Sequence, residues 1–336
     1  MASFENEYVL NGSPEDGITS VMFGPSSNIL LASSWDSNCH LYDAGANIRL
    51  ASFPSKAAVL DCAFWDSTHG FCGGLDRNVK MFDFNNGSET VLGSHNSAVK
   101  CVEFSIHTGM LFTGGWDAQV CAWDPRAQSP QVHALQQPAK VFTMGLSDHR
   151  LVVGCAGRAV QVYDLRSLGA GPLERRESSL KFQTRCVRCF TDRTGYALGS
   201  IEGRVAVEYF EDGGGGGAPP NPMGGGQKYA FKCHRTKQAV FPVNAMAFHP
   251  VHGTFATGGC DGFVNIWDAK NKKRLSQFHQ YPTSISSLAF NYDGSLLAIA
   301  VSYTFEQGEI NHPEDQIVVR VISEADVRPK PRGEKK

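Results

Sequence analysis

The chain lacks the features that mark several common classes of function. Its 31 Lys and Arg nearly balance its 33 Asp and Glu, so the basic excess typical of proteins that bind nucleic acid or membrane surfaces generically is missing. No apolar run approaches the length of about eighteen residues that a membrane-spanning helix needs. The N-terminus, MASFENEYVL, has neither the basic nor the apolar region of a signal peptide, and we therefore expect a protein that is not secreted.

Motifs for catalysis and metal binding are missing as well. The chain contains no G-x-x-x-x-G-K-[ST] phosphate loop and no G-x-S-x-G nucleophile elbow. Cys186 and Cys189 form a single C-x-x-C pair, whereas a zinc site needs a second pair or nearby histidines, so alternation along a strand explains the spacing equally well. The other cysteines lie mostly in strand-like runs and are typical of small buried residues in a reducing compartment. We expect no enzymatic activity, no cofactor and no metal.

What the chain does contain is an internal repeat of nearly forty residues that closes on an aromatic-Asp pair. An acidic residue lies seven positions before the closing Asp in four of the repeats. Such a repeat predicts an all-β protein, a WD-repeat β-propeller, which usually serves as a docking surface. The pairs are Tyr42-Asp43, Phe82-Asp83, Trp123-Asp124, Tyr163-Asp164 and Trp267-Asp268, and the preceding acids are Asp36, Asp76, Asp117 and Asp261.

Seven V-x-x-V-x-F-like starts of inner strands predict seven blades within one domain, residues 1–327. The stretch Glu5 to Leu10 precedes the first inner strand, so we expect it to be the outer strand of blade seven, closing the ring. The glycine-rich segment 212–226 is expected to be a disordered loop, and the basic segment 328–336 a disordered tail.

Blades three and six carry the full hydrogen-bonding tetrad of a WD repeat. The turn Asp should bond the His across the turn, and the Trp should reach the Thr or a neighbouring hydroxyl. Small twisted sheets need such a network because they have little core of their own. The two tetrads are His95, Thr113, Asp117 and Trp123 in blade three, and His234, Thr257, Asp261 and Trp267 in blade six.

Blade five departs from the repeat. With the inner strands aligned on their closing Phe, Arg185 and Arg188 occupy slots that are apolar in the other blades. A buried guanidinium needs an acceptor. For Arg188 we favour an internal pair with Glu202, Glu208 or Glu177. For Arg185, at the rim of the central channel, we favour an external acidic ligand, with an internal pair as the alternative.

Two tryptophans occupy turn tips, directly before the acid, in blades one and three. Trp35 and Trp116 should emerge on the face where the inner strands begin, which we call the top face. Tryptophan is enriched at binding hot spots. The alternative is that each ring lies flat on a neighbouring loop.

The segments GSIEGRVAVEY, KYAFKCHR, FATGGCDGFVNIWD and NHPEDQIVVR closely resemble the Bub-three family of mitotic checkpoint WD-repeat proteins, over nearly the whole chain. The Gle-two type of mRNA-export propeller is a near relative that shares FKCHR and AFHPVHGT. The resemblance implies a non-enzymatic adaptor of the spindle assembly checkpoint. Members bind the acidic GLEBS segment of a Bub-type kinase and of a BubR/Mad-type pseudokinase, and recognise phosphothreonine MELT repeats of a kinetochore scaffold.

By the same resemblance, Trp35, Trp116 and Arg185 match positions for GLEBS binding, and Arg204 and Lys232 look like the pair that reads the phosphate. The alternative for the second pair is an internal role for Arg204 beside Glu202 or Glu208, with a solvated Lys232. The family is nuclear and kinetochore-bound in mitosis, with a cytoplasmic pool, and we expect a monomer. The other functions considered are mRNA export at the nuclear pore and substrate reception for a ubiquitin ligase.

Overall fold

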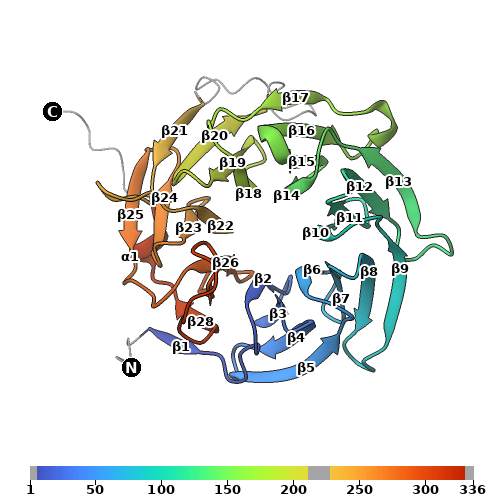
Figure 1. Ribbon diagram of the computed structural model, residues 1–336, viewed down its shortest axis with the longest axis horizontal. Helices are drawn as coiled ribbons and strands as arrows, with labels where there is room; N and C mark the ends of the chain where they lie inside the picture. The colour runs from blue at the N-terminus through green and yellow to red at the C-terminus, as the bar shows by residue number, and fades with distance from the viewer. Residues whose placement is uncertain (1–5, 211–227, 330–336) are drawn as a thin grey trace.

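The computed structural model describes residues 6–210 and 228–329, which form a ring of seven four-stranded antiparallel sheets around a central axis (Figure 1). The predicted seven-bladed β-propeller is therefore confirmed. The predicted glycine-rich loop lies outside the described residues, as does the tail beyond residue 329.

Each blade uses its strands in chain order from the axis outwards, except that blade seven takes its outermost strand from the N-terminus. Blade one contains β2 (Ile18–Phe23), β3 (Ile29–Ser34), β4 (Asn38–Asp43) and β5 (Ile48–Pro54). Blade two contains β6 (Val59–Phe64), β7 (His69–Gly74), β8 (Asn78–Asp83) and β9 (Glu89–Ser94). Blade three contains β10 (Val99–Ser105), β11 (Met110–Gly115), β12 (Gln119–Trp123) and β13 (Gln131–Gln136). Blade four contains β14 (Val141–Ser147), β15 (Arg150–Cys155), β16 (Ala159–Asp164) and β17 (Glu174–Glu177). Blade five contains β18 (Thr184–Cys189), β19 (Gly195–Ser200), β20 (Arg204–Tyr209) and β21 (Tyr229–Lys232). Blade six contains β22 (Val243–Phe248), β23 (Phe255–Gly259), β24 (Val264–Asp268) and β25 (Lys273–Gln277). Blade seven contains β26 (Ile285–Phe290), β27 (Leu296–Val301), β28 (Gln316–Val321) and β1 (Glu7–Val9). Two 3₁₀ turns, Ala156–Arg158 and Leu168–Ala170, and the short helix α1 (Glu324–Val327) complete the elements.

The ring closes at β1, as the sequence predicts, although Asn6 and Leu10 of the predicted stretch lie outside the strand and Glu5 lies outside the described residues. β1 pairs antiparallel with β28, with Tyr8 opposite Val319. The carboxylate of Glu7 accepts hydrogen bonds from Arg320 at 3.0 Å and from Tyr281 at 2.9 Å, and it also contacts His279. This buried cluster ties the first described strand to blades six and seven and covers the edge of β28, which would otherwise be exposed.

Both predicted tetrads are present as hydrogen-bonded networks. In blade three the indole of Trp123 donates to Thr113 at 2.7 Å, and the Thr113 hydroxyl lies 2.8 Å from Nε2 of His95. The Nδ1 of His95 lies 3.1 Å from the carboxylate of Asp117. A neutral His95 with its proton on Nδ1 satisfies every group in this chain.

Blade six repeats the network with nearly the same distances. His234 lies 2.8 Å from both Asp261 and Thr257, and the indole of Trp267 donates to Thr257 at 2.9 Å.

Blades one and two keep the turn acid but pair it differently, which the sequence pattern did not reveal. In blade one, His40 lies 2.8 Å from Asp36 and 2.8 Å from Ser52. In blade two, Lys80 takes the place of the histidine and lies 3.6 Å from Asp76.

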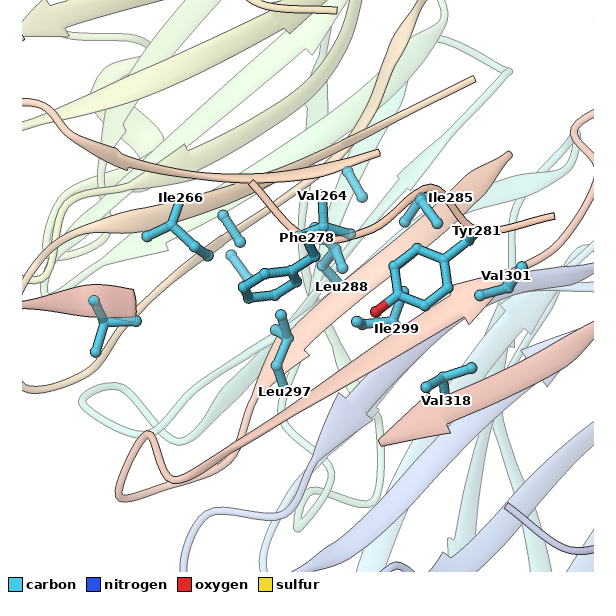
Figure 2. Packing of buried hydrophobic residues seen from close by; sticks show 14 residues of the cluster. Val264, Ile266, Phe278, Tyr281, Ile285, Leu288, Leu297, Ile299, Val301 and Val318 are labelled. Carbon is cyan, nitrogen blue, oxygen red and sulfur yellow. The ribbon is translucent and has the colours of Figure 1, made fainter. Parts of the chain in front are cut away.

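Apolar cores between neighbouring blades hold the ring together. Figure 2 shows the core between blades six and seven, where Phe278 and Tyr281 pack beside aliphatic side chains of β24, β26 and β27. Val327 of α1 packs into the same core. Each fully buried aliphatic or aromatic side chain contributes about 1.5–3 kcal/mol, so these interfaces supply most of the stability that a single blade lacks. The residues labelled in Figure 2 are Val264, Ile266, Phe278, Tyr281, Ile285, Leu288, Leu297, Ile299, Val301 and Val318.

The strand pairing corrects our alignment of blade five by one residue. In blade three, Val99 pairs with Gly115, Lys100 is bulged, and Cys101 pairs with Gly114. In blade five, Thr184 pairs with Ser200 and Cys186 with Gly199, so Arg185 is the bulged residue. Thr184 and Val187 therefore fill the apolar slots that we assigned to Arg185 and Arg188. The error arose because Cys189, not Phe190, closes this strand opposite Tyr196.

A one-residue shift moves a side chain to the other face of a strand, so neither arginine is buried in the core between blades.

Candidate docking face

The turns between the second and third strands bring both predicted tryptophans to the top face. The backbone N–H of Trp35 donates to the carbonyl of Gly17, and that of Trp116 to the carbonyl of Ala98, each at 2.9 Å. Ile201 makes the equivalent bond to Gln183 at 3.1 Å in blade five. The seven turn-tip residues joined in this way are Trp35, Leu75, Trp116, Ala156, Ile201, Cys260 and Ser302.

A central cavity of about 840 Å³ opens among these turns, and Trp35, Trp116 and Arg185 all line it. The structure thus brings the three residues of the predicted GLEBS site to one concave surface. The bulged residue of every inner strand also lines this cavity, forming what we call the bulge ring. Its members are Thr19, Leu60, Lys100, Phe142, Arg185, Asn244 and Ser286.

The three side chains are available to a ligand to different degrees. Trp35 is 50% exposed, although its ring partly lies against Gly17. Arg185 is exposed, and among the described residues it forms no ion pair. Trp116 is half-buried beneath Lys140, whose amine lies 5.9 Å from the ring centre, and its indole N–H has no acceptor among the described residues.

Arg188 forms an internal ion pair, as we favoured, but with a different acid. Its guanidinium lies 3.3 Å from the carboxylate of Glu103 in blade three and donates to the carbonyls of Met144 and Val187. The expected partners make other contacts and lie elsewhere. Glu202 accepts a backbone N–H from Lys181, Glu208 accepts from Ser179, and Glu177 pairs with Arg158.

Glu103 has an unusual environment for a carboxyl group. Burial raises its pKa to about 7, the nearby charge of Asp61 acts in the same direction, and Arg188 opposes both. The wall of the channel therefore contains an acid that titrates near neutral pH.

The predicted phosphate-reading pair lies at the top edge of blade five. Arg204 begins β20 and Lys232 ends β21, and the two residues are directly opposite each other in the strand pairing. Although Lys232 lies just before His234 of blade six in the sequence, β21 belongs to blade five, so one sheet carries both residues. Lys228 precedes Tyr229 at the opposite end of β21, and Arg235 lies in the loop beyond Lys232.

Neither acid that we considered as an internal partner pairs with Arg204. Among the described residues Arg204 forms no ion pair with Glu202 or Glu208, and its buried Nε has no acceptor. Lys232 is exposed. An unpaired, partly buried guanidinium beside an exposed amine is a suitable arrangement for a phosphate group.

The loop between β27 and β28 in blade seven adds residues to the cavity that the sequence did not reveal. Tyr303, Phe305, His312 and Asp315 line it. Phe305 is 66% exposed and has a backbone φ of 59°, which is rare for a bulky residue. The only signal in the sequence was the interruption of blade seven at residues 311–314, at the same turn that carries tryptophan in blades one and three.

We expected neither a metal site nor a membrane-spanning helix. Within residues 6–210 and 228–329, no group of three or more His, Cys, Asp or Glu side chains could hold a metal ion. Cys186 and Cys189 belong to different apolar clusters. In the same part of the chain, no helix has both the length and the apolar character needed to cross a membrane.

Comparison with known proteins gives matches to a repeat family and to full-length relatives. The family model described as WD domain, G-beta repeat matches residues 4–43, 87–124 and 225–268. The "Mitotic checkpoint protein BUB3.1" of Arabidopsis thaliana is 52% identical over 331 residues, covering 96% of this chain and 95% of that protein. The "Mitotic checkpoint protein bub3" of Dictyostelium discoideum is 45% identical and covers 96% and 97%. The "mRNA export factor GLE2" of Chaetomium thermophilum is 33% identical and covers 100% and 96%.

Proposed function

The chain belongs to the Bub3 family of mitotic checkpoint proteins, and from this premise we propose that it is a non-enzymatic adaptor of the spindle assembly checkpoint. It binds the GLEBS segments of a Bub-type kinase and of a BubR/Mad-type pseudokinase in the central cavity of the top face. It recruits them to kinetochores by recognising phosphothreonine in MELT repeats of the scaffold. The protein is accordingly nuclear, is bound to kinetochores in mitosis and has a cytoplasmic pool, and it is monomeric without its partners.

The observation that carries the GLEBS proposal is that Arg185, on the same cavity wall as the two tryptophans, has no ion-pair partner within residues 6–210 and 228–329. An exposed guanidinium at the mouth of a cavity attracts a carboxylate, and the tryptophans offer large rigid contact surfaces around it. The indole N–H of Trp116, which has no acceptor in the described part of the chain, adds a donor for which a bound peptide could supply the acceptor.

Calorimetric titration with a synthetic acidic GLEBS peptide tests this site. The Arg185→Ala variant should bind the peptide about 2 kcal/mol more weakly than the wild-type protein, the usual scale for losing a desolvated charged contact. Arg193→Ala is a matched control, because Arg193 is an exposed arginine that lies 3.3 Å from Asp148, away from the cavity lining. Equal affinities for the wild-type protein and the folded Arg185→Ala variant would refute the assignment.

The phosphate proposal rests on two observations. Arg204 and Lys232 lie directly opposite each other on paired strands, and neither forms an ion pair among the described residues. A phosphothreonine carries about −1.5 to −2 charges and three strong acceptor oxygens. Two cations fixed on paired strands can bind it with little loss of conformational entropy.

A double variant, Arg204→Ala with Lys232→Ala, should lose binding to a phospho-MELT peptide and keep binding to the GLEBS peptide. Fluorescence anisotropy with phosphorylated and unphosphorylated peptides measures the preference directly. If the double variant still prefers the phosphorylated peptide, the phosphate is read elsewhere, and Lys228 and Arg235 become the next candidates.

A second candidate function, mRNA export at the nuclear pore, is favoured by the similarity to the export factor GLE2. The two functions differ in the ligands that the isolated protein should bind. A checkpoint adaptor binds phospho-MELT peptide in preference to single-stranded RNA, whereas preferential binding to RNA would favour export.

A further inference from the structure

The corrected register of blade five shows that Arg185 has a counterpart on the cavity wall. The bulged residue of each inner strand lines the cavity, and two of the seven are cations, Lys100 in blade three and Arg185 in blade five. Phe142 is the bulged residue of blade four, the blade that separates them. The other four members of the bulge ring are uncharged: Thr19, Leu60, Asn244 and Ser286.

Neither cation of the bulge ring is neutralised within residues 6–210 and 228–329, where Lys100 and Arg185 form no ion pair. Two acids deeper in the same wall contact groups other than Lys100 and Arg185. Asp61 accepts the backbone N–H groups of Val102 at 2.8 Å and of Cys62 at 3.0 Å, and Glu103 lies 3.3 Å from Arg188. Lys100 in blade three and Arg185 in blade five therefore remain without an acidic partner among the described residues. The ring of Phe142, in blade four, lies between their two blades.

The part of the cavity formed by blades one and seven carries acidic rather than basic side chains. Asp16 and Asp315 line it on blades one and seven, together with His312. Asp16 accepts the N–H of Gly17 at 2.7 Å, and Asp315 accepts that of Tyr303 at 3.1 Å. Neither acid forms an ion pair among the described residues, so this part of the cavity disfavours an acidic segment. An acidic segment is consequently attracted to the side of blades three to five.

We propose that Lys100 is a second anion-binding residue of the cavity, which holds one carboxylate of an acidic ligand segment while Arg185 holds another, with the segment lying across Phe142. The inference rests on the proposed GLEBS function and specifies what the cavity requires of its ligand. A segment with a single carboxylate leaves one cation without a partner and binds more weakly. Because the cations lie on different blades, the spacing of the two acids selects among acidic peptides.

A calorimetric series with the GLEBS peptide tests this inference. Lys100→Gln should weaken binding about tenfold, as expected when one charged contact in a partly desolvated site is lost. Lys100→Arg keeps the charge and should restore most of the affinity. Lys273→Gln, on the exposed outer strand of blade six, is a matched control that should bind like the wild-type protein.

Peptides in which each acidic residue is replaced by its amide complete a set of double-mutant cycles. One amide replacement should no longer weaken binding when the peptide is titrated into Lys100→Gln. A different replacement should no longer weaken binding to Arg185→Ala. If Lys100→Gln binds like the Lys273→Gln control while Arg185→Ala is impaired, the inference is wrong and the proposed function stands. If the wild-type protein does not bind the peptide, the proposed function and the inference both fail. Circular dichroism of each variant separates lost binding from lost folding.

Discussion

Single side chains decide what this propeller can bind and how its blades hold together. Arg185 is placed in the channel because it is the bulged residue of β18, one position away from the buried slot of Thr184. Had the register differed by one residue, the guanidinium would have been buried between blades at a large desolvation cost. The tetrads also depend on single side chains, because in each of them one threonine hydroxyl connects a histidine to a tryptophan.

We predict that Thr113→Val destabilises the protein by about 2 kcal/mol, because it leaves the buried indole N–H of Trp123 and Nε2 of His95 without a partner. The shape of the side chain is nearly unchanged, so the effect reports the hydroxyl alone. Thermal unfolding measures it. Thr90→Val, on the exposed outer strand of blade two, is the matched control and should leave the midpoint unchanged. Equal midpoints for both variants would mean that the tetrad contributes no stability.

Glu103 should make stability depend on pH near neutrality. Its pKa is raised to about 7 in the folded protein, so it binds a proton that the unfolded chain releases at lower pH. A raised folded-state pKa gives stability that is present at acidic pH and is lost as the pH rises through about 7. The wild-type protein should therefore lose about 2 kcal/mol between pH 5.5 and 8 that Glu103→Gln does not lose. Urea unfolding at the two pH values gives the comparison, and an identical pH dependence in both proteins would contradict it.

At the scale of elements, the regular blades could be predicted from the sequence and the irregular parts could not. The spacing of His95, Asp117 and Trp123 predicts both the turn and its hydrogen bonds, because the network requires those residues at those positions. Blade five misled the alignment because Phe190, the apparent closing residue, lies one position beyond the strand. The partner of Arg188 was missed for a related reason, since Glu103 is 85 residues away and only the closed ring brings it near.

The closing strand β1 also provides a test at this scale. Glu7 is nearly buried and accepts hydrogen bonds from Arg320 and Tyr281. Glu7→Gln leaves the Arg320 charge poorly compensated, which should cost about 2–4 kcal/mol and lower the thermal midpoint by several degrees. Glu309→Gln, in an exposed part of the blade-seven loop, should not change the midpoint. A normal midpoint for Glu7→Gln would show that the strand pairing alone closes the ring.

At the scale of the whole molecule, both proposed sites lie on the top face but on different parts of it. The cavity occupies the centre of the ring, where the bulged residues of all seven inner strands meet. Arg204 and Lys232 lie on the two outer strands of blade five. An adaptor must bind the GLEBS segment and the phosphorylated kinetochore scaffold at the same time, and two separate sites allow it to do so.

The central claim is therefore simultaneous binding, which one calorimetric titration tests directly. Phospho-MELT peptide is titrated into protein already saturated with GLEBS peptide. We predict one-to-one binding, with a dissociation constant within about threefold of that measured without the GLEBS peptide, because the two sites share no residue. Loss of phosphopeptide binding, or displacement of the GLEBS peptide during the titration, would contradict the adaptor account.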